Sequence, residues 1–130
     1  MEFTIHTDEG EYDLSAHARM IGDDLLVAIW GGEKPHIGAV AAAESRPSTK
    51  DPDQTSATVS VFCYLMHKED DIAKAAAKKL STALDTKVVV TAGIHWDNLS
   101  ADGIQRVNRN CEILVTTVQE RIQTEREEGP

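Results

Sequence analysis

The chain has 130 residues, of which 41% are hydrophobic and 27% charged, and its formal net charge at pH 7 is −9. This length suits one domain with a single buried core, so we expect residues 1–130 to form one domain. The acidic balance disfavours nucleic acids and anionic membranes as partners. We expect a cytoplasmic protein, because no run approaches the roughly 20 apolar residues that span a bilayer and the N-terminus lacks signal-type features.

The first half of the chain is predicted to form strands. Apolar or small residues alternate over 11–20, Gly22 and Asp23 suit a hairpin turn, and 25–30 is almost continuously apolar. Further strands are predicted over 36–43 and 55–66. The segment 46–56 between them holds two prolines and no periodicity, which indicates a flexible loop.

The second half changes to a helical period. We predict a helix over 69–84 with acidic residues at its N-terminus, a buried strand over 86–94, and a second helix over 98–123 that Ser100 caps. The expected apolar stripe of the second helix is Ile104, Val107, Cys111, Leu114, Val118 and Ile122. Residues 124–130 are expected to fray. This order predicts an α+β fold, with a mostly antiparallel sheet of about five to six strands and both helices packed on one face.

The two cysteines, Cys63 and Cys111, lie far apart in apolar periodic segments. Neither belongs to a CxxC pair, so we interpret both as buried thiols in a reducing compartment.

Three polar segments interrupt the pattern: "GGEKPHIG" (31–38), "HKEDD" (67–71) and "TAGIHWDN" (91–98). Each follows an apolar strand, and the second and third lead into helices, whose N-termini attract phosphate and carboxylate groups. Glycines allow close approach, histidines exchange protons near neutral pH, and charged side chains lie beside them. The candidate binding residues are Gly31, Gly32, Pro35, His36, Gly38, His67, Lys68, Glu69, Gly93, His95, Asp97 and Asn98.

Simpler interpretations stay open for each of these residues. The glycines and Pro35 are also what a turn requires, and a single loop histidine is usually only solvated. A specific alternative is a small metal-dependent hydrolase or lyase that uses His36, His67, His95 and Asp97. No pair of these histidines has the short spacing of a metal motif. Trp96, beside a loop histidine, is a better candidate than Trp30 for a stacking wall.

The segments "IGDDLLVAIWGGEKPHIGAV", "HKEDDIAKAAAKKL" and "VVVTAGIHWDNLSADGI" resemble the prenylated-flavin chaperone-like family, which includes the small D-type subunit of gallate decarboxylase. The resemblance covers about residues 21–114. It implies a non-catalytic accessory protein that binds prenylated FMN, or FMN, or delivers it to a UbiD-type decarboxylase of aromatic or unsaturated acids. A separate flavin prenyltransferase makes that cofactor and is a second partner to consider.

The predicted antiparallel strands also invite self-association, since exposed strand edges pair with one another. We therefore expect a homo-oligomer, most simply a dimer joined edge to edge. Because His36 and His95 lie in polar junctions, their replacement by alanine is expected to reduce ligand binding and leave folding nearly unchanged.

Overall fold

The computed structural model describes residues 1–64 and 69–129. Its elements in chain order are β1 (Glu2–His6), β2 (Leu14–Ile21), β3 (Asp24–Gly32), β4 (Ala39–Pro47), β5 (Thr55–Cys63), α1 (Asp70–Leu84), β6 (Val88–His95) and α2 (Ala101–Glu128). The strands form one sheet in the order β1-β2-β3-β6-β4-β5. All neighbours are antiparallel except β3 and β6, which run parallel.

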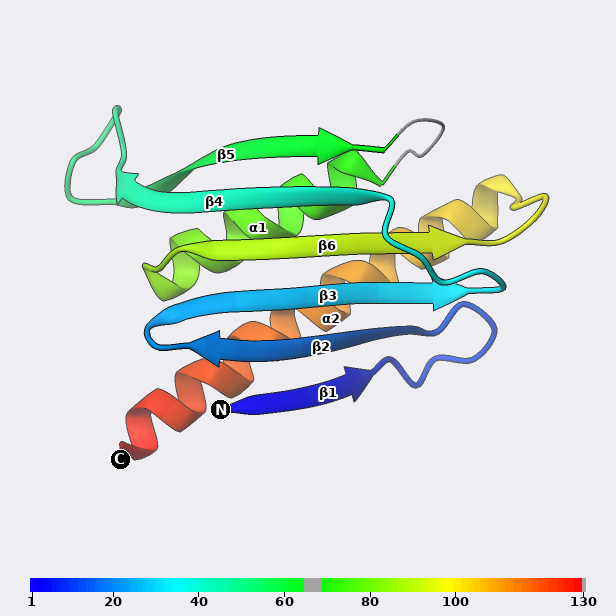
Figure 1. Cartoon of the computed structure of the whole chain (residues 1–130), viewed down its shortest axis with the longest axis horizontal. Helices are drawn as coiled ribbons and strands as arrows, with labels where there is room; N and C mark the ends of the chain where they lie inside the picture. Colours follow the sequence, from blue (N-terminus) through cyan, green and yellow to red (C-terminus); the bar gives the residue numbers. More distant parts are fainter. Residues whose placement is uncertain (65–68, 130) are drawn as a thin grey trace.

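Both helices cover the same face of the sheet, and the other face is open (Figure 1). Helix α1 packs on β4, β5 and β6, whereas α2 packs on β1 and β2. The α+β prediction, with a mostly antiparallel sheet and helices on one face, is therefore confirmed. Neither described helix combines the length and apolar character that crossing a bilayer requires.

The core lies between the sheet and the helices. Alternation along the strands turns Leu14 and Ile29 inward, where they meet Leu80 of α1 and Leu114 of α2, all at most 2% exposed. Alanines line the contact between β4 and α1, and their small side chains let the helix lie close to the strand. They are Ala39, Ala41, Ala43, Ala73, Ala76 and Ala77.

Some boundaries differ from the predictions. Residues 46–47, expected in the loop, pair with residues 55–56 in the β4–β5 ladder, so the connection narrows to 48–54. The fraying expected over 124–130 is wrong for most of that segment, since α2 continues to Glu128. Ile104, expected on the buried stripe of α2, is 49% exposed, whereas the other five stripe residues are buried. Ser100 caps α2 as predicted, its Oγ accepting a hydrogen bond from Gly103 N at 3.0 Å.

Candidate functional site

One end of the molecule gathers the described parts of the three polar segments. At the right of Figure 1, β3 and β6 end, β4 begins and both helices begin. The β3–β4 connection crosses the end of β6 and is held to it by two backbone hydrogen bonds. Glu33 N donates to His95 O at 2.8 Å, and Gly38 N donates to Ala92 O at 2.9 Å. We call the described residues 31–38, 69 and 93–98 the junction site. His67 and Lys68 lie outside the described residues.

Two glycines of the junction site permit close contacts between backbone segments. A Cβ on Gly93 would lie 1.4 Å from the carbonyl oxygen of His36, and a Cβ on Gly32 would lie 2.1 Å from that of His95. Gly32 also has a φ of +89°, which side chains other than glycine disfavour. The space expected for a ligand beside these glycines is thus filled by the chain itself.

The other two glycines of the first segment are equally enclosed. A Cβ on Gly31 would meet the side chain of Leu14 at 2.4 Å, and a Cβ on Gly38 would meet the carboxylate of Glu69 at 2.3 Å. Gly31 therefore serves packing, and Gly38 makes room for a buried acid. Pro35, between them, is exposed on the surface.

His36 and Glu69 contact each other within the junction site. Nε2 of His36 lies 2.8 Å from Oε1 of Glu69, and Glu69 is only 7% exposed. The other imidazole nitrogen, Nδ1, lies 2.8 Å from the carbonyl oxygen of Lys34. Each ring nitrogen of His36 therefore lies close to an oxygen atom. Oε1 of Glu69 also accepts a hydrogen bond from Ile94 N at 3.4 Å.

His95 belongs to a second, exposed cluster. Its Nε2 lies 2.8 Å from Oδ1 of Asp97, and Nζ of Lys34 lies 4.0 Å from the same oxygen. The hydrogen bond from His95 and, second, the charge of Lys34 hold the pKa of Asp97 below its usual value. These three side chains are 42–69% exposed, so solvent and ligands can reach them. Asn98, next in the chain, adopts a φ of +55° and is also exposed.

The helix N-termini do not suit a phosphate as well as the sequence indicated. Helix α1 begins after Glu69 and carries Asp70 and Asp71 in its first turn. In α2, the hydroxyl of Ser100 caps the first turn, which also contains Asp102. Carboxylates at these positions already complement the positive helix ends and repel a further anion.

The two tryptophans have different surroundings. The ring of Trp96 packs edge-on against Tyr12, with centroids 5.4 Å apart, so it is partly committed to packing. Trp30 lies half-buried on the open face of the sheet, opposite Gly93 in the β3–β6 register. The strand period over 25–30, which places every second side chain on the open face, is the signal that could have identified it.

The described residues do not support the metal site. Among residues 1–64 and 69–129, no group of three or more His, Cys, Asp or Glu side chains could hold a metal ion. The acids closest to two of the expected ligands bind them directly: Glu69 contacts His36, and Asp97 contacts His95. The third expected ligand, His67, lies outside the described residues.

A groove of about 310 Å³ lies elsewhere, between α1 and α2. Its lining combines Ile72, Ala76 and Val115 with Lys79 and Cys111. None of the candidate binding residues lines it, so it is separate from the junction site.

The fold and the junction site define a small α+β protein with a polar, histidine-bearing end, and comparison with known proteins gives its class. Residues 8–123 match the prenylated flavin chaperone LpdD-like domain, so the chain belongs to this family. It is 32% identical over 100 residues to Protein LpdD of Lactiplantibacillus plantarum (strain ATCC BAA-793 / NCIMB 8826 / WCFS1), covering 75% of this chain and 68% of that protein. The family resemblance is thus confirmed.

Among solved structures, a chain of a chaperone complex for yeast 20S proteasome assembly matches with a TM-score of 0.47 and 18% identity. The match covers 88% of this chain and 96% of that one. We draw no functional conclusion from a likeness at this level.

Proposed function

We propose that this chain is a non-catalytic accessory protein that binds prenylated FMN, or FMN, and delivers it to a UbiD-type decarboxylase. Membership of the prenylated flavin chaperone family over residues 8–123 carries the proposal. The substrates of such a partner are aromatic or unsaturated acids, gallate among them, and a flavin prenyltransferase is the source of the cofactor. The metal-dependent hydrolase or lyase has no support in either the family or the described residues.

The exposed side of the junction site suits the polar parts of a flavin. Lys34 offers a cation for a phosphate, and His95 offers a ring nitrogen beside it, 42% exposed. Trp30, half-buried on the open face at the level of Gly93, offers an aromatic surface for the ring system. Prenylated FMN supplies the decarboxylation chemistry in the partner enzyme, so this chain needs only to hold and release it.

His36 and Glu69 have a different part in the proposal. Because the Glu69 carboxylate is buried and contacts both His36 and Ile94 N, the pair supports the shape of the site from within. We therefore assign ligand contact to Lys34, His95 and Trp30, and positioning to His36 and Glu69.

Titration of the purified protein with prenylated FMN and with FMN, followed by flavin fluorescence, tests the binding step. The two tryptophans provide a matched pair of variants. Trp30→Leu is expected to weaken flavin binding at an unchanged melting temperature, whereas Trp96→Leu is expected to lower the melting temperature. Reconstitution of a UbiD-type apo-decarboxylase with and without the chain tests delivery. Failure to bind either flavin, with no effect on reconstitution, contradicts the proposal.

We also propose that the chain acts as a homodimer. The support is its open sheet face, since an uncovered sheet with apolar side chains is a surface for association. Light scattering on the purified chain measures this state directly.

A further inference from the structure

We infer that the open face of the sheet, rather than a strand edge, is the homodimer interface. This inference deepens the self-association proposed above and rests on it. The open face consists of the strand side chains that point away from α1 and α2. Its occupant is a second copy of this chain, packed face to face as a β-sandwich.

The middle of the open face is mostly apolar over four adjacent strands, with Thr91 of β6 and Ser60 of β5 as its polar members. The register places Leu26 of β3, Val89 of β6 and Ala42 of β4 side by side in one row. Leu26 and Val89 are 38% and 37% exposed, large values for apolar residues at the centre of a sheet. In the next row, Val40 of β4 is paired with Phe62 of β5, which is 60% exposed. A second sheet would remove these side chains from water.

The open face carries balanced charge. The whole chain has a net charge of −9, so two copies of it repel each other at long range. On the open face, alternation places three acids against three bases. They are Glu2, Asp24 and Glu44, and Arg19, Arg46 and Lys87.

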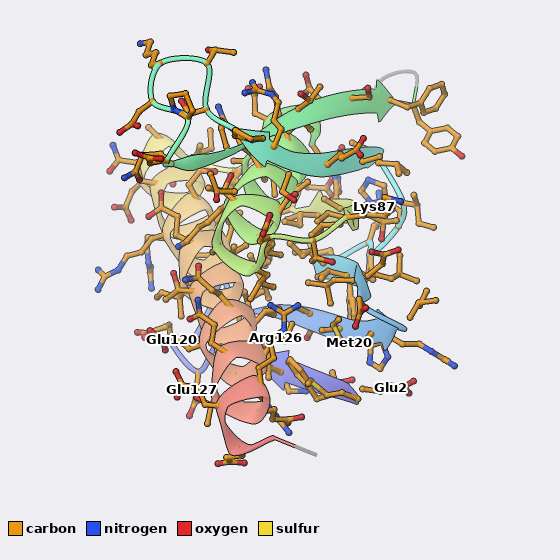
Figure 2. The ribbon with its side chains drawn as sticks, turned by 90° about the vertical axis from the view of Figure 1, so that its left-hand side faces the viewer. Glu2, Met20, Lys87, Glu120, Arg126 and Glu127 are labelled. Carbon is orange, nitrogen blue, oxygen red and sulfur yellow. The ribbon has the colours of Figure 1, made fainter. Side chains whose placement is uncertain are left out.

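Figure 2 shows Glu2 and Lys87 on the side of the sheet away from the helices, and Glu120 and Glu127 on the outer side of α2. Two open faces therefore meet without net charge.

The strand order makes the open face complementary to itself. In β1-β2-β3-β6-β4-β5, strands β2 and β4 flank the central pair β3–β6. A two-fold axis parallel to the strands and between β3 and β6 would therefore lay β2 of one copy over β4 of the other. Arg19 on β2, which already pairs with Glu2 of β1 at 3.3 Å, then faces the strand that carries Glu44. Ala42 of β4 lies in the same row as Arg19, and Glu44 lies two residues further along β4. The distance along the strand from Ala42 to Glu44 is about 7 Å, which an arginine side chain spans.

The size of the open face matches a stable dimer. The six strands lie about 4.8 Å apart; five have eight or nine residues and β1 has five. At about 3.3 Å per residue they cover roughly 760 Å². A standard interface buries about 800 Å² per partner, so this face alone suffices. The same two-fold axis keeps the junction sites of both copies at one end of the dimer, where Trp30 lies at the rim of the interface.

Light scattering over a concentration series tests the inference, with Val89→Glu as the variant and Ile104→Glu as its control. Both residues are exposed, at 37% and 49%, but Ile104 lies on α2. Wild type and Ile104→Glu are expected to have the mass of a dimer. Val89→Glu is expected to raise the dimer dissociation constant about tenfold or more, because it buries an unpaired charge. Circular dichroism checks that each variant is folded.

A charge exchange keeps the test decisive if Val89→Glu does not fold. Glu44→Arg is expected to weaken the dimer, and adding Arg19→Glu is expected to restore it. A wild-type monomer at every concentration overturns self-association and the interface together. A dimer that persists in folded Val89→Glu, or in Glu44→Arg, overturns the assignment of the interface to the open face but leaves self-association in place. A monomer whose Val89 becomes protected only with a decarboxylase shows that the occupant is a different protein. Flavin titration of the wild-type chain tests the proposed flavin binding separately.

Discussion

The imidazole of His36 reaches from the β3–β4 connection to the carboxylate of Glu69 at the N-terminus of α1, with Nε2 and Oε1 2.8 Å apart. The same carboxylate oxygen accepts a hydrogen bond from Ile94 N in β6. One buried acid thus ties together a loop, a helix start and a strand end. The link explains how the chain can hold polar segments from distant parts of its sequence in one place.

This link separates two histidines that the sequence treated alike. His36→Ala is expected to lower the free energy of unfolding by about 2 kcal/mol, because the buried carboxylate of Glu69 loses a polar partner. His95→Ala is expected to change it by less than about 0.5 kcal/mol, because its contact with Asp97 is exposed. Urea denaturation of the two variants measures both values.

A double-mutant cycle isolates the pair. Glu69→Gln is expected to destabilise the chain, and adding His36→Ala to it is expected to cost less than His36→Ala costs in wild type. Equal stability of His36→Ala and wild type would show that the pair supports nothing.

Gly93 provides a second prediction. Gly93→Ala is expected to destabilise the chain by about 3 kcal/mol or more, because its Cβ would overlap the backbone carbonyl of His36. Gly38→Ala is expected to cost less, since its Cβ would meet a carboxylate that can move. Thermal unfolding ranks the two variants, and Ser60→Ala, on the exposed side of β5, is the control. Gly93→Ala melting with wild type would contradict the close approach.

Local periodicity was enough to predict most of the fold. Alternation and helical spacing indicated the β2–β3 hairpin, α1, β6 and the start of α2, because these elements bury one regular face. The end of α2 was not predictable in this way. Ile122 is fully buried, and Nη1 of Arg126 donates to the carbonyl oxygen of Leu84 at 2.8 Å. Such tertiary contacts hold a polar segment in a helix that its own composition does not favour.

The junction site was predictable as a meeting of segments but not in its details. Strand ends and helix starts indicated that the polar residues gather. The structural roles of Gly93, Glu69 and Trp30 depend on the parallel register of β3 and β6 and on the path of the β3–β4 connection. Neither follows from spacing along the chain.

The two cysteines are expected to react differently with iodoacetamide. Burial raises the pKa of the Cys111 thiol to about 12, so it carries almost no thiolate at pH 8. Cys63, near the end of β5, is only partly buried, which corrects the prediction of two buried thiols. Mass spectrometry of the folded chain is expected to show faster labelling of Cys63, and both sites labelled in urea. Preferential labelling of Cys111 in the folded chain would be the contrary result.

Asp97 provides a prediction about pH. Its pKa lies below the ordinary value of 3.8, first because of the hydrogen bond with His95 and then because of the Lys34 charge. His95→Ala is therefore expected to raise the pKa of Asp97, and Lys34→Met to raise it less. A carboxyl group whose pKa is lowered by folding stabilises the folded chain at any pH above the pKa of that group in the unfolded chain. This small contribution is lost as the pH falls below about 3.8. Carbon-detected NMR titration of Asp97 measures the shift, with His17→Ala as a control distant in sequence and on another strand. An unchanged Asp97 pKa in His95→Ala would show that the contact does not persist in solution.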